Sequence, residues 1–122
     1  MYLNYLQDLT KMVLNCKHNS NFHGIIFTND LTKNKIIFED VMCLFSLMCH
    51  EHVNFNCTDF NNNKNKIYLI KFDNNSYIFI TSLETNKNSK ARYNQVIVDP
   101  NIHFFDYEKY IYPRFRQYRK YD

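Results

Sequence analysis

Two consecutive apolar runs, residues 66–72 and 76–83, constrain the fold of this chain more than any other feature. The short sequence Asp73-Asn-Asn75 separates them, so we expect a β-hairpin with an asparagine-rich turn. Both runs are apolar on both faces, which is typical of central strands that are covered on each side. Any fold for this chain therefore has to place other elements against this pair of strands.

The first half of the chain shows both helical and strand periods. A helical stripe predicts an amphipathic first helix; its members are Tyr2, Leu6, Leu9, Val13 and Cys16. Residues 22–28 are typical of a buried strand, Asn29-Asp30 of a turn, and Lys35–Phe38 of a returning second strand. A second helix is expected from Glu39 and Asp40, because acidic residues favour a helix N-terminus. Its apolar stripe is Val41, Leu44, Phe45 and Met48.

The second half of the chain predicts further strands and an extension. Residues 53–60 alternate between apolar and polar, residues 84–95 are polar and predict a loop, and residues 96–98 suit a sixth strand. We therefore predict an α+β domain with one antiparallel sheet of five to six strands and two main helices, in the order α-β-β-α-β-β-β. The globular domain is placed at residues 1–100 and a C-terminal extension at residues 101–122. Two short helices cannot cover both faces of such a sheet, so one face is expected to stay open for a partner or for the C-terminal segment.

The end of the chain is the clearest candidate for partner binding. Aromatic and basic side chains alternate there; the candidate residues are Tyr110, Tyr112, Arg114, Phe115, Arg116, Tyr118, Arg119 and Lys120. Three interpretations are open: this stretch packs on its own domain, docks on a protein, or stacks on RNA or DNA through its aromatic and arginine planes. Near-helical spacing from Tyr107 to Phe115 favours packing on the domain, with Pro113 ending or kinking the helix.

Composition limits the class of protein and its compartment. The formal charge of +3 is too small for a protein that coats nucleic acid. Asn, Lys, Ile, Tyr and Phe dominate and there is one Gly, which indicates an AT-rich genome, such as that of an intracellular parasite or a large DNA virus. The N-terminus does not have the pattern of a signal peptide, and no apolar run has membrane-spanning length. We expect a cytoplasmic or nuclear protein that is not secreted, does not bind membranes and keeps its thiols reduced.

Catalytic and metal-binding patterns are weak. Residues 49–52 read Cys-His-Glu-His, with Cys57 nearby, but the spacing is not that of a zinc site. A nucleophilic pair such as Cys49–His52 or Cys57–His23 has no supporting signature. Gly24 is the single glycine, which excludes a glycine-rich phosphate loop. The sequence therefore predicts a protein that is not an enzyme and that needs no metal or cofactor.

The element order resembles the roadblock family of dynein light chains and the related profilin-like adaptors of GTPase regulation. Residues 21–30, Asn-Phe-His-Gly-Ile-Ile-Phe-Thr-Asn-Asp, are similar to that family's first hairpin, and residues 65–80 are similar to its last two strands. The resemblance covers residues 2–83, although Leu31-Thr-Lys-Asn34 stands where the family usually has another glycine, and the basic tail is no part of the family pattern. It implies a non-enzymatic module that dimerises and scaffolds.

We therefore expect an adaptor or a small subunit of a larger complex, as a homodimer or heterodimer, that docks through its open sheet face and its basic-aromatic tail. The alternative is an RNA- or ribosome-associated protein whose tail contacts nucleic acid.

Overall fold

A four-stranded mixed sheet forms the middle layer of the protein. The computed structural model describes residues 3–48, 67–87 and 89–115. The strands are β1 (His23–Thr28), β2 (Tyr68–Lys71), β3 (Tyr77–Ser82) and β4 (Gln95–Val98). They lie in the order β2-β3-β1-β4. β1 runs parallel to β3 and to β4, and β2 is antiparallel to β3.

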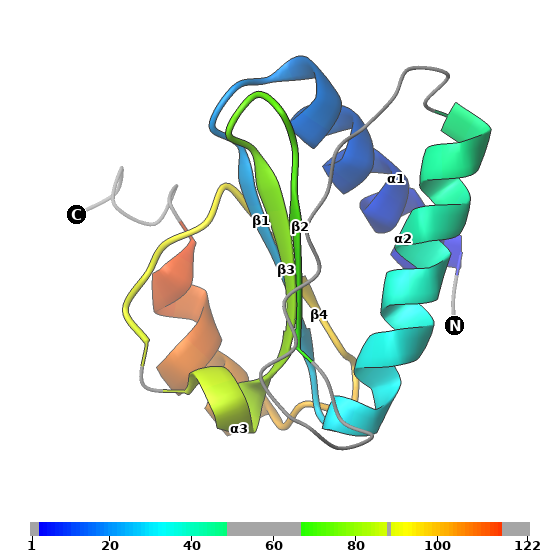
Figure 1. The fold of residues 1–122 in the computed structure, drawn as a ribbon. Coiled ribbons are helices and arrows are strands. Elements are labelled where there is room, and N and C mark those ends of the chain that lie inside the picture. Colours follow the sequence, from blue (N-terminus) through cyan, green and yellow to red (C-terminus); the bar gives the residue numbers. More distant parts are fainter. Residues whose placement is uncertain (1–2, 49–66, 88, 116–122) are drawn as a thin grey trace.

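Helical elements lie on both faces of this sheet (Figure 1). One face is covered by the two long helices, α1 (Leu3–His18) and α2 (Asn34–Met48). The opposite face is covered by α3 (Leu83–Asn86) and by three short helical turns near the end of the described chain. These turns are α4 (Phe104–Asp106), the π-helical η2 (Tyr107–Ile111) and the 3-10 turn η3 (Tyr112–Arg114). We call residues 104–115 the C-terminal segment.

α1 packs on the sheet through a stripe at helical spacing, and the one glycine of the chain lets it approach closely. The buried side chains of the stripe are Tyr5, Leu9, Met12, Val13 and Cys16. Leu6, which we expected in the stripe, is 47% exposed. A Cβ atom at Gly24 of β1 would lie 2.7 Å from the Met12 Sδ atom, which is closer than van der Waals contact allows.

The predicted second strand at residues 35–38 is wrong, because these residues form the first turns of α2. The side-chain carboxylate of Asp30 accepts a hydrogen bond from the Thr32 backbone N–H at 3.0 Å and begins a 3-10 turn, η1 (Leu31–Lys33), that leads into α2. Ile37, Val41 and Phe45 are buried at spacings of four residues, whereas Ile36 is 62% exposed. α2 therefore begins at Asn34, five residues before the helix start that we expected at Glu39.

The sheet is mixed and not antiparallel as predicted. Residues 35–38 do not return beside β1 as an antiparallel strand, and β1 instead lies between β3 and β4 and is parallel to both. β2, the first described strand after α2, is antiparallel to β3 and pairs only with it among the described strands. Parallel strands need a crossover connection, and α3 lies between the parallel strands β3 and β4 in the chain. The strands predicted at residues 66–72, 76–83 and 96–98 are confirmed as β2, β3 and β4. The strand predicted at residues 53–60 lies outside the described residues. The region expected to be a polar loop contains α3.

The turn between β2 and β3 also holds the end of α1. The Asn74 side-chain amide donates to the carbonyl oxygens of Cys16 at 2.8 Å and Asn19 at 3.2 Å. These carbonyls have no partner within a helix that ends at His18. The same Asn74 amide lies 3.5 Å from the Lys17 carbonyl oxygen at the end of α1. Asn75 takes a positive φ of 68° in the same turn, a conformation that asparagine tolerates better than most residues.

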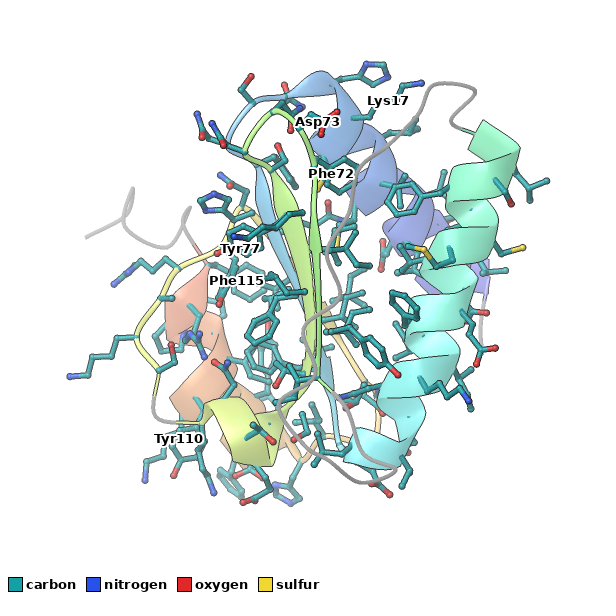
Figure 2. The ribbon with its side chains drawn as sticks, in the orientation of Figure 1. Lys17, Phe72, Asp73, Tyr77, Tyr110 and Phe115 are labelled. Carbon is teal, nitrogen blue, oxygen red and sulfur yellow. The ribbon has the colours of Figure 1, made fainter. Side chains whose placement is uncertain are left out.

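The C-terminal segment covers the sheet face that we expected to stay open for a partner or for this segment. Buried residues on this second face come from β1, the α3 start, the loop before β4 and the C-terminal segment; they are Ile25, Phe27, Leu83, Tyr93 and Ile111. Figure 2 shows Phe115 beside Tyr77 of β3 on the same face. The second face is thus covered by the chain itself over the described residues, and the interpretation that the tail packs on its own domain holds as far as Phe115.

Candidate functional site

The C-terminal segment is fixed to the domain by buried side chains and by backbone pairing. Ile111 is fully buried, and Tyr107, Tyr110 and Phe115 pack around the second-face core. The Tyr93 backbone N–H donates to the Arg114 carbonyl oxygen at 2.8 Å, and Tyr93 forms an isolated parallel bridge with Phe115. The surface that this segment presents is therefore held in place by the fold.

Arg114 joins the C-terminal segment to the loop before β4. Its side chain donates from Nε to the Ala91 carbonyl oxygen at 2.6 Å and from Nη1 to the Asn86 carbonyl oxygen at 3.1 Å. The guanidinium carbon lies 5.5 Å from the ring centre of Phe27 and 5.3 Å from that of Tyr93, within the range of cation–π attraction. Burial lowers the pKa of the Arg114 guanidinium, and the neighbouring Tyr93 opposes this shift. A charged group is thus held between two aromatic rings and two carbonyl groups.

A basic hollow of about 380 Å³ opens beside Arg114. Five cationic residues line it, and they are Lys87, Lys90, Arg92, Lys109 and Arg114. Of the described residues that line the hollow, none carries a carboxylate. Tyr110 forms part of the wall, and its half-buried side chain also packs against the second-face core. We call this feature the basic hollow.

An exposed aromatic pair lies at the start of the same segment. Phe104 is 67% exposed and Phe105 is 74% exposed. Their ring centres are 6.2 Å apart, and the His103 ring stacks on Phe105 at 5.3 Å. Adjacent exposed phenylalanines in a folded segment are typical of a contact surface for another macromolecule.

The eight residues predicted to bind a partner divide into two groups. Tyr110, Tyr112, Arg114 and Phe115 are described: Tyr112 is 43% exposed, Tyr110 and Phe115 are half-buried, and Arg114 is only 4% exposed. Arg114 is buried because its side chain donates hydrogen bonds to backbone carbonyls of its own domain. The sequence did not indicate this structural role. The other four, Arg116, Tyr118, Arg119 and Lys120, lie outside the described residues.

Sequence reasoning missed the residues that complete this surface. Lys87, Lys90 and Arg92 fall in the region that we expected to be a polar loop, and Phe104 and Phe105 were assigned no role. The density of cations in residues 87–92 was the available signal. Its meaning depends on the C-terminal segment lying next to it, which local patterns do not reveal.

A second polar cluster lies where the parallel strands β1 and β4 end. Carboxyl ends of parallel strands are common places for ligand sites. Here the polar groups bind one another: Thr28 Oγ1 donates to Asn34 Oδ1 at 2.6 Å, and Lys33 Nζ pairs with Asp99 at 3.0 Å. Burial alone would raise the pKa of Asp99, but hydrogen bonds from the Asn101 backbone N–H and from Lys33 outweigh it and hold that pKa below its usual value. We interpret this cluster as structural.

The thiol and imidazole groups considered as weak candidates fall mostly outside the described residues, since residues 49–52 and Cys57 lie there. Cys16 is buried, its thiol lies near the carbonyl oxygens of Phe22 and Tyr77, and burial raises its pKa to about 12. Such a thiol is a poor nucleophile. Among residues 3–48, 67–87 and 89–115, no three His, Cys, Asp or Glu side chains come together as metal ligands would.

Comparisons with protein-family models, with curated proteins and with solved structures found no match. The resemblance to the roadblock family therefore stays a prediction. None of the helices in the described part of the chain has the length and apolar character needed to cross a membrane.

Proposed function

We propose that this protein is a non-enzymatic binding module, an adaptor or a small subunit of a larger complex, and that it docks through its C-terminal segment. The observation that carries the proposal is the exposure of Phe104 and Phe105 on a segment that the fold anchors. Aromatic side chains supply much of the binding energy in protein interfaces when a partner removes them from water. An anchored segment also loses little conformational entropy on binding.

The chemistry of the described residues supports a binding role over catalysis. Cys16 is a buried thiol with a raised pKa, and Asp99 is already paired with Lys33. Tyr5 donates from its hydroxyl to Asp40 at 3.1 Å, and burial and the Asp40 charge raise its pKa. Cys16, Asp99 and Tyr5 are each buried, whereas a general acid or base needs access to a substrate.

The proposal is tested by replacing the aromatic pair. A chain carrying Phe104→Ser and Phe105→Ser is compared with the wild-type chain in two assays. Analytical ultracentrifugation measures self-association. Affinity purification from the native host cell measures the amount of each protein that stays bound. The matched control carries Ile36→Ser and Leu47→Ser, which removes two other exposed apolar side chains, 62% and 69% exposed, from α2. We expect the aromatic variant to lose self-association or a defined set of partners that the control variant keeps. Equal behaviour of the two variants would contradict the proposed docking surface.

Nucleic-acid association is the second candidate function, and the basic hollow favours it. Five cationic residues line the hollow, and none of its described lining residues carries a carboxylate that would neutralise them. The sequence adds Arg116, Arg119 and Lys120 directly after the described segment. A protein with this surface suits a complex that contains nucleic acid.

A further inference from the structure

The basic hollow is assembled from two stretches of the chain that the fold holds together. Lys87, Lys90 and Arg92 come from the stretch between α3 and β4, and Lys109 and Arg114 come from the C-terminal segment. The two stretches are joined by the hydrogen bonds from Arg114 to the Asn86 and Ala91 carbonyl oxygens and by the Tyr93–Arg114 backbone bond. The separation of the two walls is therefore set before any ligand arrives.

Arg114 gives the hollow a buried cation. The residue is 4% exposed, and two of its three guanidinium nitrogens donate to backbone carbonyls. These bonds fix the guanidinium where it lines the hollow, and its positive charge favours an anion there.

Two of the three lysines of the hollow lie against one aromatic ring. The Lys87 ammonium lies 4.9 Å from the ring centre of Tyr110, and the Lys109 ammonium lies 5.2 Å from the same ring. The Glu84 carboxylate lies 3.7 Å from the Lys87 ammonium, and the Glu84 side chain is 82% exposed. Because water screens an exposed pair of this kind, Glu84 neutralises little of the positive charge of Lys87.

We infer that the basic hollow is a binding site for a phosphate group. Guanidinium and ammonium donors are the usual protein ligands of phosphate oxygens, and five cations around one hollow suit a phosphate better than a single carboxylate. The phosphate is either part of a nucleic-acid backbone or a free phosphate ion or nucleotide, and the chemistry of recognition is the same for both. This inference does not depend on the aromatic docking surface, so failure of one leaves the other standing.

The test uses the full chain, a fluorescently labelled single-stranded uridine 12-mer, and inorganic phosphate. Lys90→Ala with Lys109→Ala removes two exposed cations of the hollow, and Lys11→Ala with Lys71→Ala removes two exposed cations elsewhere. Thermal melts of both variants establish that they fold. We expect the hollow variant to bind the 12-mer about tenfold more weakly and its salt slope to flatten by about 1.4, because each phosphate contact on a single strand contributes about 0.7. The control variant is expected to bind like the wild-type chain.

Inorganic phosphate distinguishes the two sources of the phosphate group. Competition by phosphate at millimolar concentration, with a shift of the Arg114 Nε–H resonance in the NMR spectrum, would identify a site for free phosphate. Binding of the 12-mer without such competition would identify a site for the nucleic-acid backbone. Either result supports the inference. It would be overturned if neither probe bound, or if the control and hollow variants lost affinity equally, because the attraction would then be a diffuse property of the net charge.

Discussion

Replacing Arg114 with alanine should destabilise the whole domain by about 3 kcal/mol. The side chain makes two hydrogen bonds from a charged group, at 2.6 Å to the Ala91 carbonyl and 3.1 Å to the Asn86 carbonyl, and such bonds contribute about 1.5–3 kcal/mol each. Loss of the contacts with the Phe27 and Tyr93 rings adds about 0.5–2 kcal/mol. Ala91 is exposed, so water replaces part of the first bond, which keeps the total near the lower end of this sum.

Urea denaturation followed by far-UV circular dichroism measures this change, with Arg114→Lys as the matched variant. Lysine keeps the charge but cannot donate in two fixed directions, so we expect it to lose about half as much stability as alanine. We also expect the slope of the unfolding free energy against urea to fall if the alanine variant releases the C-terminal segment before unfolding, because less surface is then exposed in the transition. A loss below about 0.5 kcal/mol for Arg114→Ala would refute this reasoning, because the segment would not belong to the cooperative unit.

Four further predictions follow from the fold. Gly24→Ala should cost about 1–3 kcal/mol by forcing a Cβ atom against Met12, and Met12→Ala in the same chain should recover part of that loss in a double-mutant cycle. Asn74→Ala should cost about 1–2 kcal/mol in chemical denaturation, because the end of α1 loses its side-chain partner. The lowered pKa of Asp99 contributes stability that is fully present above about pH 4 and is lost as the pH falls through the folded-state pKa. Asp99→Asn should therefore flatten the acid side of a stability profile measured by denaturation from pH 6 to pH 2. Deleting residues 104–122 should expose the second-face core and produce a chain that aggregates or binds a hydrophobic dye, and a soluble chain with a sharp melt would contradict this.

Strands and turns that rest on short-range patterns could be predicted from the sequence. The β2–β3 hairpin follows from two apolar runs joined by asparagines, and Asn75 adopts the positive φ that such a turn requires. The first helix was also predicted. The prediction of its buried face was partly wrong, because Leu6 is exposed and Tyr5 is buried.

The helix over residues 34–38 could not be predicted by periodicity alone. A run of three apolar residues, as in Ile36-Ile-Phe38, fits a strand and a helix equally well. The deciding signals were Asp30 as the cap of the preceding turn and the spacing of Ile37, Val41 and Phe45. These signals favour a helix between β1 and β2, whereas the pairing of β1 with β3 and β4 is a long-range arrangement.

The candidate site could be predicted only in part, for a different physical reason. The tail was identified from its composition, but the burial of Arg114 depends on carbonyl groups 23 and 28 residues earlier in the chain. Likewise, the cations of residues 87–92 gain a role only when the C-terminal segment lies beside them. These are long-range arrangements, and local sequence patterns carry no information about them.

Hydrogen exchange at the Tyr93 backbone amide tests most directly whether the C-terminal segment is part of the folded domain. This amide donates to the Arg114 carbonyl oxygen at 2.8 Å, so its protection requires the segment to be docked. We predict that in the full chain Tyr93 exchanges nearly as slowly as Ile26 at the centre of β1. Fast exchange at Tyr93 alongside slow exchange at Ile26 would show that the sheet folds without the segment, and it would contradict both the covered second face and the preformed basic hollow.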